Sequence, residues 1–311
     1  MTDPVVDALR VAGVADVRGG ASLGAFTTLR VGGPARALVT AHHDDELRAV
    51  GDVCQSFALP WAVIGRGSNL LVADRGWPGV AAVLGSGYRG IAFTGVRVVV
   101  GAAEPLPAVA THVAAAGLSG FAWAVAVPGS VGGAVRMNAG AHGGQVADHL
   151  VEADIVRLRT GVRETWPAAA LGLRYRHSDL PDDAVVVSAT LQLAHHEPQA
   201  VRAELDAIRA WRRANQPINS PTCGSVFTNP TGDSAGRLIE AAGGKGLRVG
   251  GATVSMKHAN FIVTHRDASA ADVLALMRAV QELVKERFGV LLQPEVVVLG
   301  DVEAADGSND G

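Results

Sequence analysis

Two isolated polar residues are the first candidates for chemistry in this 311-residue chain. Glu295 interrupts the apolar run 291–299, where burying an unpaired carboxylate is expensive. It is either held in a structural ion pair or used as a catalytic carboxyl, since burial raises its pKa toward the range of a general acid. Ser225 lies in the segment 222–230 without the G-x-S-x-G pattern of hydrolases. A nucleophilic triad is therefore not expected, and the local pattern is also typical of an ordinary strand residue after a glycine turn.

A third candidate is the polar cluster 174–179, Arg-Tyr-Arg-His-Ser-Asp, which lies between two apolar segments. It is either a solvated loop or an anion clamp, because arginine binds carboxylates through two parallel hydrogen bonds. The ten histidines and two cysteines show no metal-ligand spacing. We therefore expect no metal site.

The glycine-rich stretch 124–144 has the composition of a ligand-binding turn. Six glycines allow positive φ angles or close backbone approaches, and Pro128 fixes φ just before the first of them. Bare amides in succession bind an anion or the polar edge of a flat ring. Ser130, Asn138 and two apolar patches are interleaved with the glycines, and a solvated linker would not need them. The stretch therefore predicts a buried turn that lines a ligand.

A second glycine-rich loop, 65–69, reads Gly-Arg-Gly-Ser-Asn between two apolar runs. A dinucleotide fingerprint would open a helix at this point. Leu70 instead starts another apolar run that is typical of a strand. The loop is therefore a poor match to a Rossmann fold, but its amides suit a pyrophosphate.

Composition limits the protein class. With 48% hydrophobic and 18% charged residues, the chain is globular and long enough for two domains. A net charge of −3 argues against nucleic-acid binding, and no run reaches the roughly 20 apolar residues of a membrane helix. Two cysteines and an N-terminus without the features of a signal peptide favour the cytoplasm.

Strands and helices alternate along the chain, with a composition shift near 196–200. Periodicity predicts helices at 4–18, 44–57, 107–116, 201–211, 234–242 and 269–288, the last with a capping box at Ser269 and Asp272. It predicts strands at 27–35, 37–40, 61–65, 80–84, 96–101, 152–159, 185–193, 224–227, 253–264 and 291–299, the last interrupted by Pro294. Residues 302–311 form a polar tail.

Seven motifs follow one another in a specific order: Thr28–Ala35, Gly65–Leu71, Pro128–Gly133 with Met137–Gly140, Tyr175-Arg176-x-Ser178, Gly224–Pro230, Gly250–Ser255 with His258–Ile262, and Pro294–Val296. Over about residues 23–300 they resemble the UDP-N-acetylenolpyruvoylglucosamine reductase family, flavoenzymes of peptidoglycan precursor synthesis, in its shorter subtype. Each motif alone is weak, but seven in order are highly specific.

The resemblance implies an α+β fold. It consists of an FAD-binding domain of the vanillyl-alcohol-oxidase or p-cresol-methylhydroxylase type, built from two α+β subdomains, and a C-terminal α+β substrate domain. The expected boundaries are an N-terminal extension at 1–22, the FAD-binding domain at 23–197, the substrate domain at 198–300 and a disordered tail at 301–311. The expected protein is a cytoplasmic monomer.

The resemblance also implies non-covalent FAD, NADPH as co-substrate and UDP-N-acetylenolpyruvoylglucosamine as substrate. The FAD pyrophosphate would lie on Gly65, Arg66, Gly67, Ser68, Asn69 and Leu70. The isoalloxazine would lie on Pro128, Gly129, Ser130, Gly132 and Gly133, near Asn138, Ala139 and Gly140. Flavin N5 would give hydride, Ser225 would protonate the neighbouring carbon, and Arg176 and Glu295 would stabilise the enolate. Expected substrate contacts are Tyr175, Arg213, Gln216, Asn229 and His258.

Two departures and two alternatives accompany the resemblance. Thr228 stands where the family often has a basic residue, and Cys223 where it usually has alanine. One alternative is another FAD oxidase or dehydrogenase of the same fold; many of these attach flavin through a histidine, which the loop 65–69 lacks. The other is a non-enzymatic flavin-binding protein, in which Ser225, Arg176 and Glu295 would fall into three motifs by accident.

Overall fold

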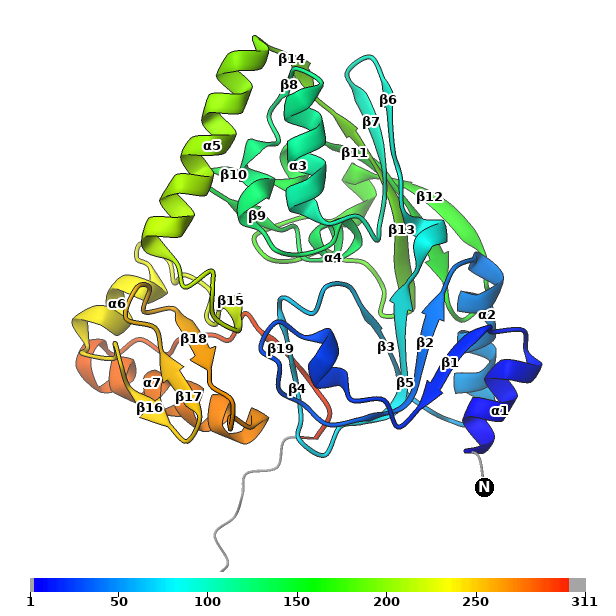
Figure 1. Ribbon diagram of the computed structural model, residues 1–311, viewed down its shortest axis with the longest axis horizontal. Coiled ribbons are helices and arrows are strands. Elements are labelled where there is room, and N and C mark those ends of the chain that lie inside the picture. Colours follow the sequence, from blue (N-terminus) through cyan, green and yellow to red (C-terminus); the bar gives the residue numbers. More distant parts are fainter. Residues whose placement is uncertain (1–2, 302–311) are drawn as a thin grey trace, which may run out of the picture. The chain divides into compact units, whose positions relative to one another are not determined.

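The computed structural model describes residues 3–301, so the tail expected at 302–311 lies outside the described residues. The chain folds into two compact units, and neither is continuous in sequence (Figure 1). The first unit contains the residues up to 20, together with 36–66 and 79–214. The second contains 21–35, 67–78 and 215–301.

The first unit begins with a four-stranded sheet in the order β1-β2-β5-β3. The elements of this layer are β1 (Asp16–Gly19), β2 (Ala35–Ala41), β3 (Trp61–Ile64), β5 (Trp77–Leu84), α1 (Pro4–Val11) and α2 (Asp44–Ser56). Leu9 of α1 and Leu47 of α2 are fully buried in the core that they share with β2. Figure 1 shows both helices beside this sheet.

A second layer of the first unit is an antiparallel five-stranded sheet in the order β12-β11-β13-β7-β6. Its strands are β6 (Ile91–Thr94), β7 (Arg97–Gly101), β11 (Leu150–Arg157), β12 (Arg163–Pro167) and β13 (Ala184–Gln192). The helices of this part are α3 (Leu106–Ala115), α4 (Val131–Arg136) and α5 (Pro198–Asn215), with the short strands β8 (Leu118–Ser119), β9 (Gly140–Ala141), β10 (Gly144–Gln145) and β14 (Ala194–His195). The two sheets with their helices are the two α+β subdomains that were expected.

The second unit has its own antiparallel sheet, in the order β15-β18-β17-β16, with α6 and α7 beside it (Figure 1). Its elements are β15 (Thr222–Ser225), β16 (Arg248–Val249), β17 (Ala252–Val254), β18 (Phe261–Thr264), α6 (Ala235–Ala241) and α7 (Ala270–Phe288), and a parallel pair formed by β4 (Leu70–Val72) and β19 (Val297–Leu299). Leu29 and Val31 are buried in its core, so the segment 21–35 belongs to this unit.

Four predicted elements differ from the structure. The strand predicted at 253–264 is two strands, β17 and β18, separated by residues 255–260, which turn the chain so that the two strands pair antiparallel. The strand at 27–35 is wrong: a 3-10 turn (Leu23–Phe26) comes first, and Arg30 then takes φ +58 with its N–H bonded to Thr27 Oγ1. A strand cannot pass through that left-handed residue. The helix at 4–18 ends at Val11, because Gly13 turns with φ +93 and β1 follows. The last strand contains only Val297–Leu299.

Glu46 joins the start of α2 to two other segments. Its side chain accepts the backbone N–H groups of His42, His43 and Ala15, and the residue is only 8% exposed. Burial raises the pKa of Glu46, but the three N–H donors outweigh it and hold the pKa below its ordinary value of 4.5. The carboxylate is therefore a stabilising acceptor at neutral pH.

We expect Glu46→Gln to lower the free energy of unfolding at pH 7 by about 1.5–3 kcal/mol, the range for hydrogen bonds to a charged group. The folded pKa lies below the unfolded one, so the stabilisation is present above about pH 4.5 and is lost as the pH falls through the folded pKa. Urea unfolding of parent and variant should show a smaller difference in the free energy of unfolding at pH 3 than at pH 7. Glu282→Gln, on the exposed side of α7, is the control. A difference that is equal at both pH values would contradict this role.

Candidate functional site

The loop between β3 and β4 presents three successive backbone N–H groups. Within residues 3–301, no hydrogen-bond acceptor is found for the N–H groups of Arg66, Gly67 or Ser68. Gly67 has φ +59, and a Cβ at this position would lie 2.0 Å from the carbonyl oxygen of Phe26. Successive amides around a left-handed residue form an anion-binding nest. This loop therefore fits the pyrophosphate that was predicted to bind it.

The two glycine-rich stretches meet in the first unit. A Cβ on Gly65 would lie 2.4 Å from Ser130 Oγ, so glycine is required for this close approach. Arg66 Nε donates to the carbonyl oxygen of Pro128 at 3.1 Å. The fold thus brings together two stretches that were assigned to the same cofactor from their composition.

The central stretch, predicted as a buried turn, contains a helix that was not predicted. Residues Val131–Arg136 form helix α4, with Ser130 as its N-cap. The N–H groups of Val131 and Gly132 donate to the carbonyl oxygens of Glu104 and Ala102, and that of Gly133 donates to Ser130 Oγ. These amides are occupied inside the protein. The prediction of bare amides was wrong here, because the acceptors lie on a distant segment that local sequence does not reveal.

Arg176 lies at the tip of a tight turn. The N–H and carbonyl of Arg174 pair with the carbonyl and N–H of His177, and Arg176 takes φ +54 between them. Arg176 Nη2 donates to the Gly140 carbonyl oxygen at 2.9 Å, and the guanidinium carbon lies 4.9 Å from the Tyr175 ring centroid. Tyr175 itself is 53% exposed. The cluster is therefore a hydrogen-bonded turn at the surface, in which Arg174, Tyr175, His177 and Asp179 are exposed.

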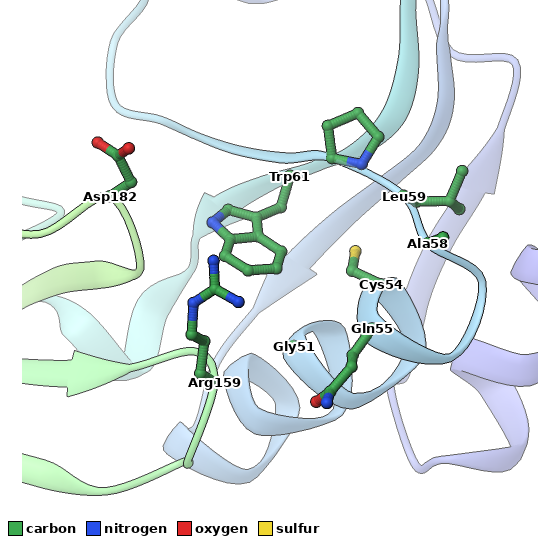
Figure 2. Close-up of a pocket in the computed structure, with 9 residues that line it drawn as sticks. Gly51, Cys54, Gln55, Ala58, Leu59, Trp61, Arg159 and Asp182 are labelled. Carbon is green, nitrogen blue, oxygen red and sulfur yellow. The ribbon is translucent and has the colours of Figure 1, made fainter.

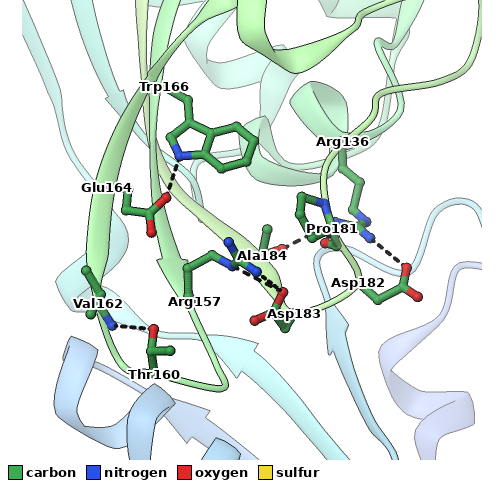
Figure 3. Close-up of polar contacts among 10 residues, drawn as sticks. All are labelled: Arg136, Arg157, Thr160, Val162, Glu164, Trp166, Pro181, Asp182, Asp183 and Ala184. Carbon is green, nitrogen blue, oxygen red and sulfur yellow. Dashed lines mark hydrogen bonds and ion pairs between the residues drawn. The ribbon is translucent and has the colours of Figure 1, made fainter.

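The segment after this turn is anchored to α4. Ser178 Oγ donates to the Arg136 carbonyl oxygen at 2.6 Å. Figure 3 shows Arg136 reaching the segment 181–184, where Nη1 donates to the carbonyl oxygens of Pro181 and Ala184. Ser178 therefore has a structural role within the motif Tyr175-Arg176-x-Ser178. The sequence had predicted no role for this residue.

In the second unit, Ser225 and Glu295 are brought to the same strand end. Ser225 is the last residue of β15 and lies opposite Phe261 on β18. Its neighbour Val226 accepts the Glu295 N–H at 2.8 Å and donates to the Asn260 carbonyl oxygen at 2.9 Å. Glu295 is half-buried rather than buried.

Asn260 and Asn69 hold this region, and sequence reasoning missed both functions. Asn260 is 3% exposed and clasps Phe227, accepting its N–H at 3.0 Å and donating to its carbonyl oxygen at 2.8 Å. Asn69 Nδ2 donates to the Glu295 carbonyl oxygen at 3.0 Å, so the loop after β3 also fixes Glu295. The available signal was that each asparagine lies inside a motif, Asn69 within Gly65–Leu71 and Asn260 within His258–Ile262.

The expected substrate residues are distributed over both units. Arg213, near the end of α5, and Asn229 are exposed, and Asn229 Oδ1 accepts the Ala235 N–H at 3.0 Å. Gln216 follows α5 directly and is half-buried. His258 packs against Phe261, and burial, with the nearby Lys245 ammonium, lowers the pKa of His258. Its ring is therefore neutral at pH 7 and available as a hydrogen-bonding group.

Comparisons with known proteins place these features in a family. A family model described as "UDP-N-acetylenolpyruvoylglucosamine reductase, C-terminal domain" matches residues 216–299, and one described as "FAD binding domain" matches 35–165. The chain is 39% identical over 300 residues to the UDP-N-acetylenolpyruvoylglucosamine reductase of Halalkalibacterium halodurans, covering 96% of this chain and 99% of that one. The chain belongs to the UDP-N-acetylenolpyruvoylglucosamine reductase family.

Other members of this family agree. The enzyme of Trichormus variabilis is 43% identical over 293 residues, covering 93% of this chain and 88% of that one. The crystal structure of the Thermus caldophilus reductase matches with a TM-score of 0.81 at 37% identity, over 92% of this chain and all of that one. The resemblance and the α+β fold with an FAD-binding domain are thereby confirmed, and the chain is an FAD-containing oxidoreductase.

The two residues that depart from the reductase family pattern, Cys223 and Thr228, make their contacts within the protein. Cys223 is a free, buried thiol, and burial raises its pKa to about 12, so it is a packing residue. Thr228 donates from both its N–H and its Oγ1 to the Gln293 carbonyl oxygen. Neither side chain carries a charge at this place.

A separate pocket lies at the other end of β3 from the glycine loop (Figure 2). It has a volume of about 390 Å³, and Arg159 stacks over the Trp61 ring at its wall. None of the predicted site residues lines it. Of the helices that the structure describes, none has the length and apolar character needed to cross a bilayer.

Proposed function

We propose that this chain reduces the enolpyruvyl ether of UDP-N-acetylglucosamine to UDP-N-acetylmuramate, with NADPH as the source of electrons. Family membership supports the substrate class. The observation that carries the proposal within the chain is the backbone hydrogen bond from the Glu295 N–H to the carbonyl oxygen of Val226, the residue after Ser225, because it brings the backbones of two separate motifs together.

We propose that FAD is held without a covalent bond. The amides of Arg66, Gly67 and Ser68 would bind the pyrophosphate, with Gly65, Asn69 and Leu70 shaping the loop. Pro128, Gly129, Ser130, Gly132 and Gly133 would form the wall for the isoalloxazine, followed by Ala139 and Gly140, and the buried Asn138 would support this region from inside the protein. Bound FAD supplies hydride transfer between NADPH and the substrate. The bare loop amides fit this cofactor, because a dianionic pyrophosphate needs several fixed donors.

The remaining chemistry belongs to side chains. Ser225 Oγ would hold the proton that goes to the carbon bearing the carboxylate. Arg176 would bind that carboxylate and stabilise the negative charge that develops on it. Glu295 would stabilise the same developing charge. Tyr175, Arg213, Gln216, Asn229 and His258 would orient the remainder of the substrate.

We also propose 23–197 and 198–300 as the FAD-binding and substrate domains in the order of the sequence, because the two family matches fall within these ranges. The compact units follow different bounds, since 21–35 and 67–78 pack in the second unit and 198–214 in the first. A monomer in the cytoplasm is the expected form. Free thiols at Cys54 and Cys223 are in keeping with a reducing compartment. Size-exclusion chromatography tests the monomer.

The test is an anaerobic titration of the purified yellow protein. NADPH should bleach the flavin, and the enolpyruvyl substrate should restore its absorbance faster than oxygen does. Acid precipitation should leave FAD in the supernatant, since the loop 65–69 contains no histidine for a covalent link. Reoxidation by oxygen alone, or flavin that stays with the pellet, would reject the proposal in favour of an oxidase of the same fold.

A further inference from the structure

The side chain of Asn138 is fully engaged inside the first unit. The residue is 0% exposed and takes φ +41. Its Nδ2 donates to the Arg174 carbonyl oxygen at 3.0 Å and to Gln145 Oε1 at 3.1 Å. Its Oδ1 accepts the Ala147 N–H at 2.9 Å. Both amide hydrogens are used, so this side chain has no donor left for a ligand.

The carbonyl that Asn138 binds is the one that closes the turn of Arg176. The Arg174 carbonyl oxygen accepts the His177 N–H at 3.0 Å as well as Asn138 Nδ2. Arg176, at the tip of this turn, has φ +54. A non-glycine residue in that conformation persists only where its surroundings hold it. The Asn138 bond therefore restrains a turn that is unfavourable alone.

Asn138 also braces the acceptor for the Arg176 guanidinium. That acceptor is the Gly140 carbonyl oxygen, in the hairpin of β9 and β10. The bonds from Asn138 to Gln145 and Ala147 tie the far strand of this hairpin and the residues after it. One buried amide thus fixes both the backbone of Arg176 and the partner of its side chain.

We infer that Asn138 is the positioning residue for Arg176 in the substrate half-reaction, rather than a direct contact of the flavin. The inference rests on the proposed function of Arg176 as the group that stabilises the enolate. Removing the two donated bonds would allow the turn and the hairpin to shift. A displacement of about 1 Å in a group that must meet developing charge is sufficient to slow a reaction on the order of 10²-fold.

The test is a double-mutant cycle with Asn138→Asp and Arg176→Ala, followed by stopped-flow absorbance of the flavin. The aspartate has the same size but lacks both donors and repels the Arg174 carbonyl. We expect flavin reoxidation by substrate to slow about 10- to 100-fold. FAD content and reduction by NADPH should stay near the parent values. In the Arg176→Ala background, Asn138→Asp should add less than about twofold, because a residue that acts through Arg176 has nothing left to position.

Amide hydrogen exchange in the segment 172–179 gives a second readout, and it should become faster in Asn138→Asp. Asn219→Asp, the same change at an exposed position, should leave both half-reactions unaltered. If Asn138→Asp does not fold, Gln145→Met removes one acceptor and should slow the same half-reaction several-fold, within the same cycle.

The outcomes separate two failures. If Arg176→Ala reoxidises at the parent rate, the proposed function of Arg176 is wrong and this inference fails with it. If reoxidation of Arg176→Ala by substrate is slow, Arg176 retains its proposed function. The inference about Asn138 is then overturned by any of three results: Asn138→Asp reoxidises at the parent rate, the rate effects of the two substitutions multiply in the double variant, or Asn138→Asp slows reduction by NADPH as much as reoxidation.

Discussion

Ser225→Ala should reduce its flavin with NADPH at nearly the parent rate and then fail to pass the electrons to substrate. Ser225 is proposed to supply a proton that is needed only after substrate has bound. We expect reoxidation by substrate to fall by roughly 10²-fold or more, the usual scale for losing a positioned general acid. Stability should change by no more than about 1 kcal/mol, because at most one hydrogen bond is lost.

Two stopped-flow traces per variant, one for each half-reaction, make this measurement. Ser56→Ala is the matched control, because its hydroxyl is exposed and bonds only within α2, to the Asp52 carbonyl oxygen. If Ser225 is merely a strand residue at the end of β15, both half-reactions will slow together or neither will. Equal effects would remove the assignment of Ser225 as proton donor.

Gly67→Ala should give a protein that no longer retains FAD. The new Cβ would lie 2.0 Å from the Phe26 carbonyl oxygen and 2.7 Å from the Thr27 Cα, both backbone atoms that cannot turn away. The loop must shift, and the nest formed by the amides of residues 66–68 would be lost. Overpacking of this kind costs about 1–3 kcal/mol, so FAD affinity should fall by up to about 10²-fold.

Gly95→Ala separates the steric clash from backbone strain. Gly95 has φ +61, almost the same as Gly67, but no atom lies within 4 Å of its Cβ position. It should lose only the roughly 1 kcal/mol that a left-handed alanine costs, and it should bind FAD normally. The ratio of flavin to protein absorbance after desalting, followed by a fluorescence titration, measures both variants. Equal FAD retention in the two would show that the loop at Gly67 does not hold the cofactor.

Features that depend on neighbouring residues could be predicted from the sequence. The capping box of Ser269 and Asp272 forms at the start of α7, and Gly289 ends that helix with φ +69, as the pattern indicated. The helix at Asp44–Ser56 and the strand at Trp61–Ile64 lie within a residue or so of their predicted bounds. The order of motifs identified the family, since such short motifs keep the types of residue that a loop conformation requires.

Hydrogen-bond partners from distant segments could not be predicted in this way. The glycines at 129–133 and at 65–67 look equally open in the sequence. The carbonyl oxygens of Ala102 and Glu104 occupy the amides at the start of α4, however, whereas the amides of residues 66–68 have no acceptor among the residues that the structure describes. Likewise, the residue type of Asn138 and its glycine-rich surroundings predict a ligand contact. Its side chain instead donates to the Arg174 carbonyl oxygen and so supports the turn that carries Arg176. Local conformation is set within one turn of chain, but the partner of a polar group is set by long-range packing, which only the folded chain reveals.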